Sequence, residues 1–116
     1  MVKSKYGEIP DVLFLKYMDR IVDNFFRSLC LKEEKCQTID LYLENFQREL
    51  VGSKKLIAVL MYDPLFLSIL GTLESLIGQN DLVKFKSDVF KSISMTKKLQ
   101  EKYMAENQNQ IIDKKN

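Results

Sequence analysis

The sequence predicts an all-α protein, a compact antiparallel bundle of four to five helices in a single domain. Four glycines and two prolines in 116 residues are too few for the many turns of an all-β fold. Apolar residues recur at helical spacing in several segments. With 46% apolar residues, the chain can also bury a continuous core. The helices are expected at about residues 10–31, 39–51, 54–62, 64–77 and 81–104.

The first predicted helix, residues 10–31, is amphipathic. Pro10 and Asp11 form a start signal, because proline suits the first turn of a helix and acidic residues favour it. Charged residues occupy one side of this helix, and apolar residues recur every three or four positions on the other. The apolar side contains Phe14, Met18, Ile21, Phe25 and Leu29.

The second and third predicted helices meet at a glycine. Thr38 is a candidate N-cap of the helix over residues 39–51, and Gly52 is its candidate stop. Ser53 is then placed to cap a short helix over residues 54–62. The second helix has a buried stripe made of Ile39, Tyr42, Leu43, Phe46 and Leu50.

Residues 56–77 contain fifteen apolar side chains in twenty-two positions, which is long enough to cross a bilayer. Asp63 and Pro64 interrupt this run at its centre, where a carboxylate in a membrane costs about 2.5–3.5 kcal/mol. Asp followed by Pro is also a helix start signal. The run is therefore interpreted as two short buried helices that meet at a corner, with Gly78 ending the second, and no transmembrane segment is predicted.

The last predicted helix, residues 81–104, begins at the cap formed by Asn80 and Asp81. Four of its lysines lie within about 40° of one another, opposite its apolar side. These lysines are Lys84, Lys91, Lys98 and Lys102. Residues 105–116 are polar and are expected to form a disordered, flexible tail that follows a domain over residues 1–104.

The composition argues against an enzyme. The chain has no histidine, which removes the commonest general base and metal ligand, and two cysteines cannot complete a structural zinc site. No catalytic residue, cofactor site or metal site is predicted. The N-terminus lacks the apolar stretch of a signal peptide, so a cytoplasmic location with Cys30 and Cys36 as reduced thiols is expected.

A single acidic residue, Glu74, lies among apolar neighbours in the predicted helices. Burial of an unpaired carboxylate is costly, so Glu74 is expected at the exposed boundary of its helix. Asp63 is interpreted as a helix cap only.

The predicted function is that of a non-enzymatic protein-binding module, a small regulatory, adaptor or inhibitor protein. Seven phenylalanines and five tyrosines are many for an all-helical chain of this size, and most of them fit the helical stripes of a core. If the domain is too small to bury all of them, the surplus forms an exposed apolar groove or a dimer face. Its partner would be another protein or, in a homodimer, a second copy. The candidate binding residues are Lys84, Lys91, Lys98, Lys102, Phe25 and Phe26.

The alternative function is binding of nucleic acid or an anionic membrane surface through the lysine face of the last helix. Only three of the eighteen basic residues are arginine, the side chain that best makes bidentate contacts with phosphate and guanine. This scarcity favours the protein-binding interpretation.

Overall fold

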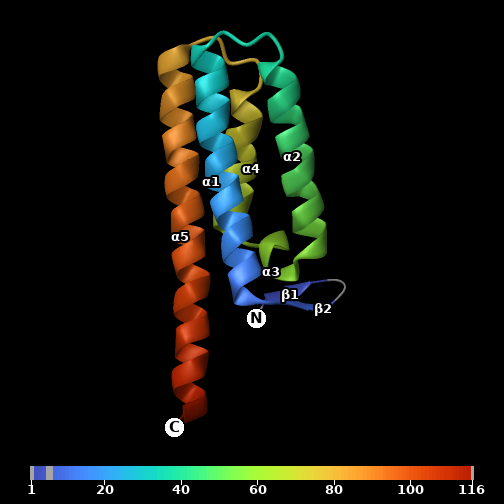
Figure 1. Ribbon diagram of the computed structural model, residues 1–116, viewed down its shortest axis with the longest axis vertical. Helices are drawn as coiled ribbons and strands as arrows, with labels where there is room; N and C mark the ends of the chain where they lie inside the picture. The colour runs from blue at the N-terminus through green and yellow to red at the C-terminus, as the bar shows by residue number, and fades with distance from the viewer. Residues whose placement is uncertain (1, 5–6, 116) are drawn as a thin grey trace.

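The structure is a computed structural model that describes residues 2–4 and 7–115. Within these residues, four long helices run alternately up and down, and Figure 1 shows them side by side. They are α1 (Asp11–Glu33), α2 (Ile39–Leu56), α4 (Pro64–Leu76) and α5 (Leu82–Lys115). A single turn, α3 (Ala58–Met61), connects α2 to α4. The predicted all-α bundle is confirmed.

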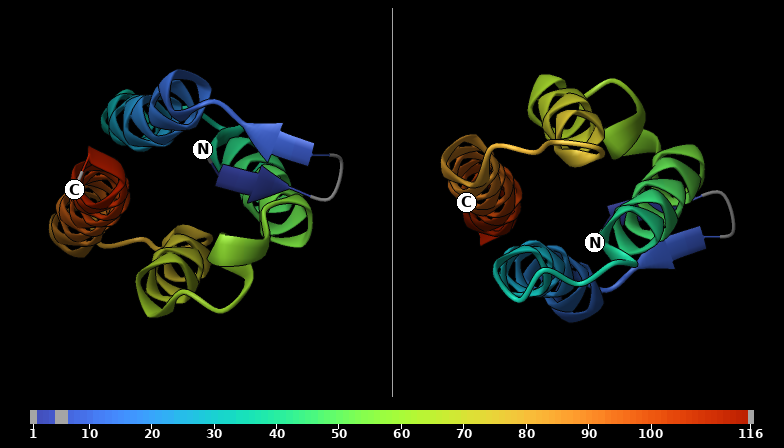
Figure 2. Two further views of the ribbon diagram at one scale, coloured as in Figure 1. Left: turned by 90° about the horizontal axis from the view of Figure 1, so that it is seen from below. Right: turned by 90° about the horizontal axis from the view of Figure 1, so that it is seen from above.

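The four long helices form a closed ring around one core. Viewed along the bundle, the ring order is α1, α2, α4 and α5, so each helix is antiparallel to both of its neighbours (Figure 2). The most extensive contacts are those of α5 with α1 and α4. The largest fully buried side chains in the core are Phe25, Phe66 and Phe85.

The apolar run at residues 56–77 contributes one side of this core. Helix α4 buries Phe66, Ile69, Leu73 and Leu76. Leu60 of α3 is also fully buried. No helix in the described part of the chain is long and apolar enough to span a membrane.

Gly52 does not end α2, in contrast to the prediction. The helix continues through Ser53, whose hydroxyl donates a hydrogen bond to the carbonyl of Glu49 at 3.1 Å, one turn earlier. A hydroxyl bonded in this way belongs to a helix interior and does not act as a cap. Helix α2 instead ends before Ile57, which is buried and has an extended backbone. Helix α3 begins only after this residue, so it is much shorter than the predicted helix at residues 54–62.

The predicted signals at both ends of α4 are confirmed. Oδ1 of Asp63 accepts hydrogen bonds from the backbone N–H groups of Leu65 at 2.9 Å and Phe66 at 3.4 Å. Pro64 occupies the first helical position. After α4, Gly78 adopts a φ of 76°, a left-handed conformation that glycine tolerates best.

The other two predicted caps differ from each other. Asp81 caps α5, because its Oδ1 accepts from the N–H groups of Val83 at 3.0 Å and Lys84 at 3.3 Å. Thr38 occupies the N-cap position of α2 but makes no side-chain cap bond. Its hydroxyl lies 3.3 Å from the sulfur of Cys36 instead.

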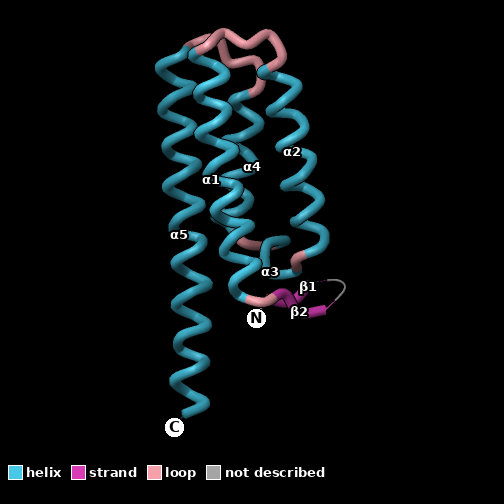
Figure 3. The backbone as a smooth tube through the Cα atoms, viewed as in Figure 1, coloured by secondary structure: helices cyan, strands magenta, loops and turns pink. Residues whose placement is uncertain are grey.

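A small β-hairpin precedes α1 and was not predicted. Strands β1 (Val2–Ser4) and β2 (Gly7–Ile9) pair in antiparallel register, with Val2 opposite Ile9. Figure 3 shows this hairpin at the end of the bundle that also holds α3. Strands of three residues are too short to show the alternating pattern by which strands are recognised, so the sequence carries no signal for them.

Helix α5 extends beyond its predicted end. The prediction ended the helix at about residue 104, whereas the structure continues it to Lys115, and Figure 1 shows this part projecting past the other helices. No glycine or proline occurs between Leu82 and Lys115 to end the helix. The structure thus describes residues 105–115 of the predicted tail as helical, and residue 116 lies outside the described residues; the flexibility of the tail stays a prediction.

Candidate interaction site

The outward side of α5 carries a row of exposed small and apolar residues. Val83, Ser87, Phe90 and Ser94 are spaced four, three and four residues apart, so they lie on one face of the helix. All four are exposed, including Val83 with 79% and Phe90 with 45% of its surface accessible. We call these four residues the α5 row.

The ring of Phe90 packs against Phe26 of α1. The two ring centroids are 6.2 Å apart and the planes meet at 78°, an edge-to-face arrangement. Phe26 is 42% exposed, so both rings are open to solvent at the seam between α1 and α5. The structure thus places one predicted binding residue, Phe26, beside an aromatic residue that was not predicted.

Phe25 was predicted as a binding residue, and the structure removes it from the site. Its side chain is fully buried and packs edge-to-face on Phe46 of α2, with ring centroids 4.9 Å apart. One residue along a helix turns the side chain by about 100°, so Phe25 points into the core when Phe26 points outward. The periodicity of the predicted first helix had already placed Phe25 on its apolar side, so the choice of Phe25 as a binding residue was wrong.

Five lysines flank the α5 row. Lys84, Lys91 and Lys98 lie on one side of it and are exposed, as the sequence predicts. Lys86 and Lys97 are also exposed and lie on the other side, toward α1. The predicted lysine stripe does not include Lys86 and Lys97, although their exposure follows from the same helical periodicity.

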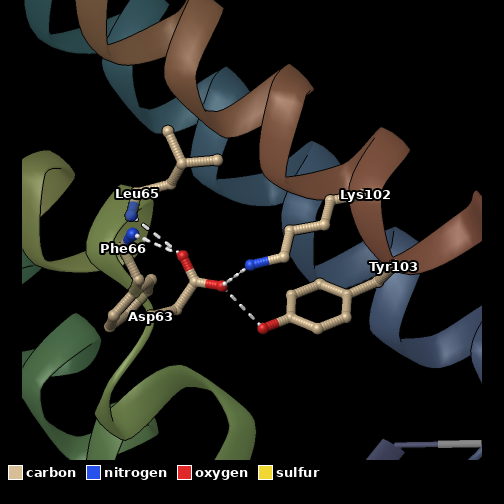
Figure 4. Close-up of polar contacts among 5 residues, drawn as sticks. All are labelled: Asp63, Leu65, Phe66, Lys102 and Tyr103. Atoms are coloured by element: carbon tan, nitrogen blue, oxygen red, sulfur yellow. Dashed lines mark hydrogen bonds and ion pairs between the residues drawn. The ribbon is translucent and has the colours of Figure 1, made fainter. Parts of the chain in front are cut away.

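Lys102, the fourth lysine of the predicted stripe, contacts the bundle. Its Nζ lies 2.9 Å from Oδ2 of Asp63, and the hydroxyl of Tyr103 donates to the same oxygen at 2.9 Å (Figure 4). The Asp63 side chain is only 2% exposed, whereas that of Lys102 is 44% exposed. Lys102 therefore has a structural role in joining α5 to Asp63 at the beginning of α4.

The Asp63 carboxylate is stabilised in its charged form. Burial alone would raise its pKa, but the hydrogen bonds from Lys102, Tyr103 and two backbone N–H groups outweigh burial and hold the pKa below its usual value. Each carboxylate oxygen has its own partners: Oδ1 caps α4, and Oδ2 binds α5. This arrangement fixes α5, and with it the α5 row, against the beginning of α4.

The seam between α1 and α2 is polar. The hydroxyl of Tyr42 donates to Oδ1 of Asn24 at 3.0 Å, and Arg20 pairs with Glu49 at 3.5 Å. Burial raises the pKa of Tyr42, so its phenol remains the donor at neutral pH. A cavity of about 210 Å³ lies between these pairs. These polar contacts join α1 to α2. The seam between α1 and α5, in contrast, exposes the apolar rings of Phe26 and Phe90.

The two cysteines are free thiols, as expected. Cys30 is exposed on α1, and Cys36 lies in the loop before α2. The hydrogen bond of Cys36 with the side chain of Thr38 lowers the pKa of its thiol, and a weaker contribution comes from the backbone of Thr38. Glu74 is exposed, as predicted.

Among the residues whose side chains the structure describes, no group of three or more potential ligands could hold a metal ion. No protein-family model, characterised protein or solved structure matches this chain. The candidate site is therefore defined by geometry alone: an exposed aromatic pair and the α5 row, bordered by lysines.

Proposed function

We propose that this protein is a non-enzymatic protein-binding module, a small regulatory, adaptor or inhibitor protein that acts through the outward face of α5. The exposed contact between Phe26 and Phe90 carries this proposal. The two free thiols support a reducing compartment such as the cytoplasm.

The aromatic pair is a suitable anchor for a protein partner. Each ring leaves more than two fifths of its surface in water, although twelve apolar core residues of similar or smaller size are completely buried. Aromatic side chains dominate the binding energy of protein interfaces, because a partner can cover a large rigid apolar area at little entropic cost. The neighbouring Val83 extends the exposed apolar surface by two helical turns.

Site-specific photo-crosslinking in cells tests this function. A photoreactive phenylalanine analogue replaces Phe90, and in a control chain the same analogue replaces Leu41, an exposed apolar residue of α2. We expect position 90 to form a discrete adduct with a defined protein, identified by mass spectrometry, and position 41 to form none. Equal labelling from both positions, or adducts only with nucleic acid or lipid, would refute the proposal.

A second candidate function is binding of nucleic acid or an anionic membrane surface. The specific observation in its favour is the five exposed lysines between Lys84 and Lys98, with Asp88 as the one acidic residue in that stretch. Binding of that kind weakens by orders of magnitude as salt increases. The double variant Lys91→Glu/Lys98→Glu should abolish binding of this kind.

A further inference from the structure

We infer that the partner of the α5 row presents an acidic amphipathic helix, an inference that rests on the proposed function and specifies its ligand. Two independent features of the face support it, the shape of the row and the sign of the charge around it. The helix would lie along α5, cover Phe90 and Phe26, and place carboxylates against the lysines on both sides.

The shape of the row suits a helix. Apolar Val83 and Phe90 alternate with the small Ser87 and Ser94 over about three turns, roughly 16 Å. Large residues alternating with small ones form the ridges and depressions into which the side chains of another helix pack. A partner helix with apolar residues at i, i+4, i+7 and i+11 would match this row.

The charged side chains of α5 that flank the row are all basic. By helical geometry, Lys97 and Lys98 lie about 50° to either side of the row, with Lys86, Lys91 and Lys84 farther around the helix. Of the acidic residues of α5, Asp88 is half-buried beside Ser75 of α4, with 3.4 Å between Oδ2 and the serine hydroxyl. On α1, the exposed Asp19 and Asp23 share the helical face of Phe26, and Asp19 accepts a hydrogen bond from Gln100 of α5 at 3.2 Å. Glu101 lies two turns past Ser94. A partner that lies along α5 must therefore supply negative charge against the lysines of that helix.

This charge pattern disfavours a second copy as the occupant. A two-fold dimer formed through this face would place five lysines against five lysines, and like charges across an interface are unfavourable. It also distinguishes the helix from nucleic acid, because a phosphate backbone would match the lysines and leave the aromatic pair and the row without an apolar contact. An acidic amphipathic helix satisfies both parts of the face.

Two designed peptides of about 16 residues test the inference. Both carry leucine at i, i+4, i+7 and i+11. The first has glutamate on both flanks of this stripe, and the second has lysine at the same positions. Calorimetry and NMR with the full chain should show the acidic peptide binding at least about tenfold more tightly at about 150 mM salt. The amide shifts should concentrate at residues 83–98 and at Phe26.

Variants of the chain test whether the acidic peptide binds at the α5 row and its flanking lysines. Phe90→Ser and Lys91→Glu/Lys98→Glu should each weaken the acidic peptide about tenfold or more, and the charge-reversed chain should bind the lysine peptide better than the native chain does. The matched controls Leu41→Ser and Lys55→Glu change exposed residues of α2 and should leave the affinity within about twofold. Circular dichroism verifies that every variant is folded.

Three results would overturn the inference: equal affinity for the two peptides, shifts spread over α2, or displacement of the acidic peptide by duplex DNA or by phosphatidylserine vesicles at about 150 mM salt. The last result would favour the alternative function. If photo-crosslinking from position 90 yields a discrete protein while the peptides show no preference, the proposed function stands and the acidic helix is refuted. If both fail, the face is not a protein-binding site.

Discussion

The hydroxyl of Tyr103 donates a hydrogen bond to the carboxylate of Asp63 at 2.9 Å, joining residues that are 40 positions apart in the chain. Asp63 also caps α4 and accepts a hydrogen bond from the ammonium of Lys102, so one buried side chain joins the beginning of α4 to α5. The candidate site is on α5, so this contact contributes, with the core packing of α5, to its position.

Replacement of Asp63 should destabilise the bundle in proportion to the contacts that the new residue loses. Asp63→Ala removes the cap and leaves the Tyr103 hydroxyl without its acceptor, which should cost about 3–4 kcal/mol of unfolding free energy. Asp63→Asn retains a cap and an uncharged acceptor, and should cost about half as much. Urea denaturation measures both. The exposed carboxylate of Glu74 is the control, and Glu74→Gln should change stability by less than about 0.5 kcal/mol.

The stabilisation from Asp63 should depend on pH in the acid range. Its pKa is lower in the folded protein than in the unfolded chain, where it is about 3.9. The contribution is therefore complete above about pH 5 and declines as the pH falls through the unfolded and then the folded pKa. Denaturation at several pH values should show the native chain losing its advantage over Asp63→Asn as the pH falls below 5. An advantage that stays constant down to about pH 2 would contradict this account of the carboxylate.

Adjacent phenylalanines should respond differently to truncation. Phe25→Ala removes a fully buried ring that packs on Phe46 and should cost about 3–5 kcal/mol. Phe26→Ala removes a ring that is 42% exposed and should cost about 1 kcal/mol. Thermal or urea unfolding of the two variants measures the difference. Equal losses would mean that α1 does not have the rotation described here.

Replacement of two glycines by alanine should change the free energy of unfolding in opposite directions. Gly52 lies inside α2, and Gly78 has a φ of 76°; at both positions an added Cβ would meet no atom within 4 Å. Gly52→Ala should therefore stabilise the protein by about 0.5–1 kcal/mol, and Gly78→Ala should destabilise it by about 1–2 kcal/mol. Unfolding free energies of the two variants test whether α2 passes through residue 52. A loss of stability from Gly52→Ala would indicate that the helix ends at Gly52, as the sequence predicted.

The helices could be predicted because their signals are local. The periodic apolar faces, the Asp63–Pro64 start and the left-handed Gly78 each act within a few residues and are found where the sequence indicates. Gly52 misled the prediction because glycine both ends helices and occurs within them, and tertiary packing decides between the two. The break falls at Ile57, whose side chain enters the core.

The candidate site could be predicted only in part. Periodicity placed Lys84, Lys91 and Lys98 on an exposed face, but it could not show that Lys102 reaches Asp63 on another helix. In the same way, Phe26 was recognised as an aromatic residue on α1, whereas its partner Phe90 is identified only once α1 and α5 are placed side by side. Contacts between distant segments were the missing information.

Solvent exposure of the seven phenylalanine rings tests the central claim, that the face around Phe26 and Phe90 is available to a partner. A soluble paramagnetic agent, added to the isotopically labelled chain, broadens the NMR signals of ring protons that it can approach. We expect strong broadening at Phe26 and Phe90. The five buried rings should be protected: Phe14, Phe25, Phe46, Phe66 and Phe85. Protection of Phe26 and Phe90 to the same degree as Phe25 would show that the face is already covered, and would contradict the account.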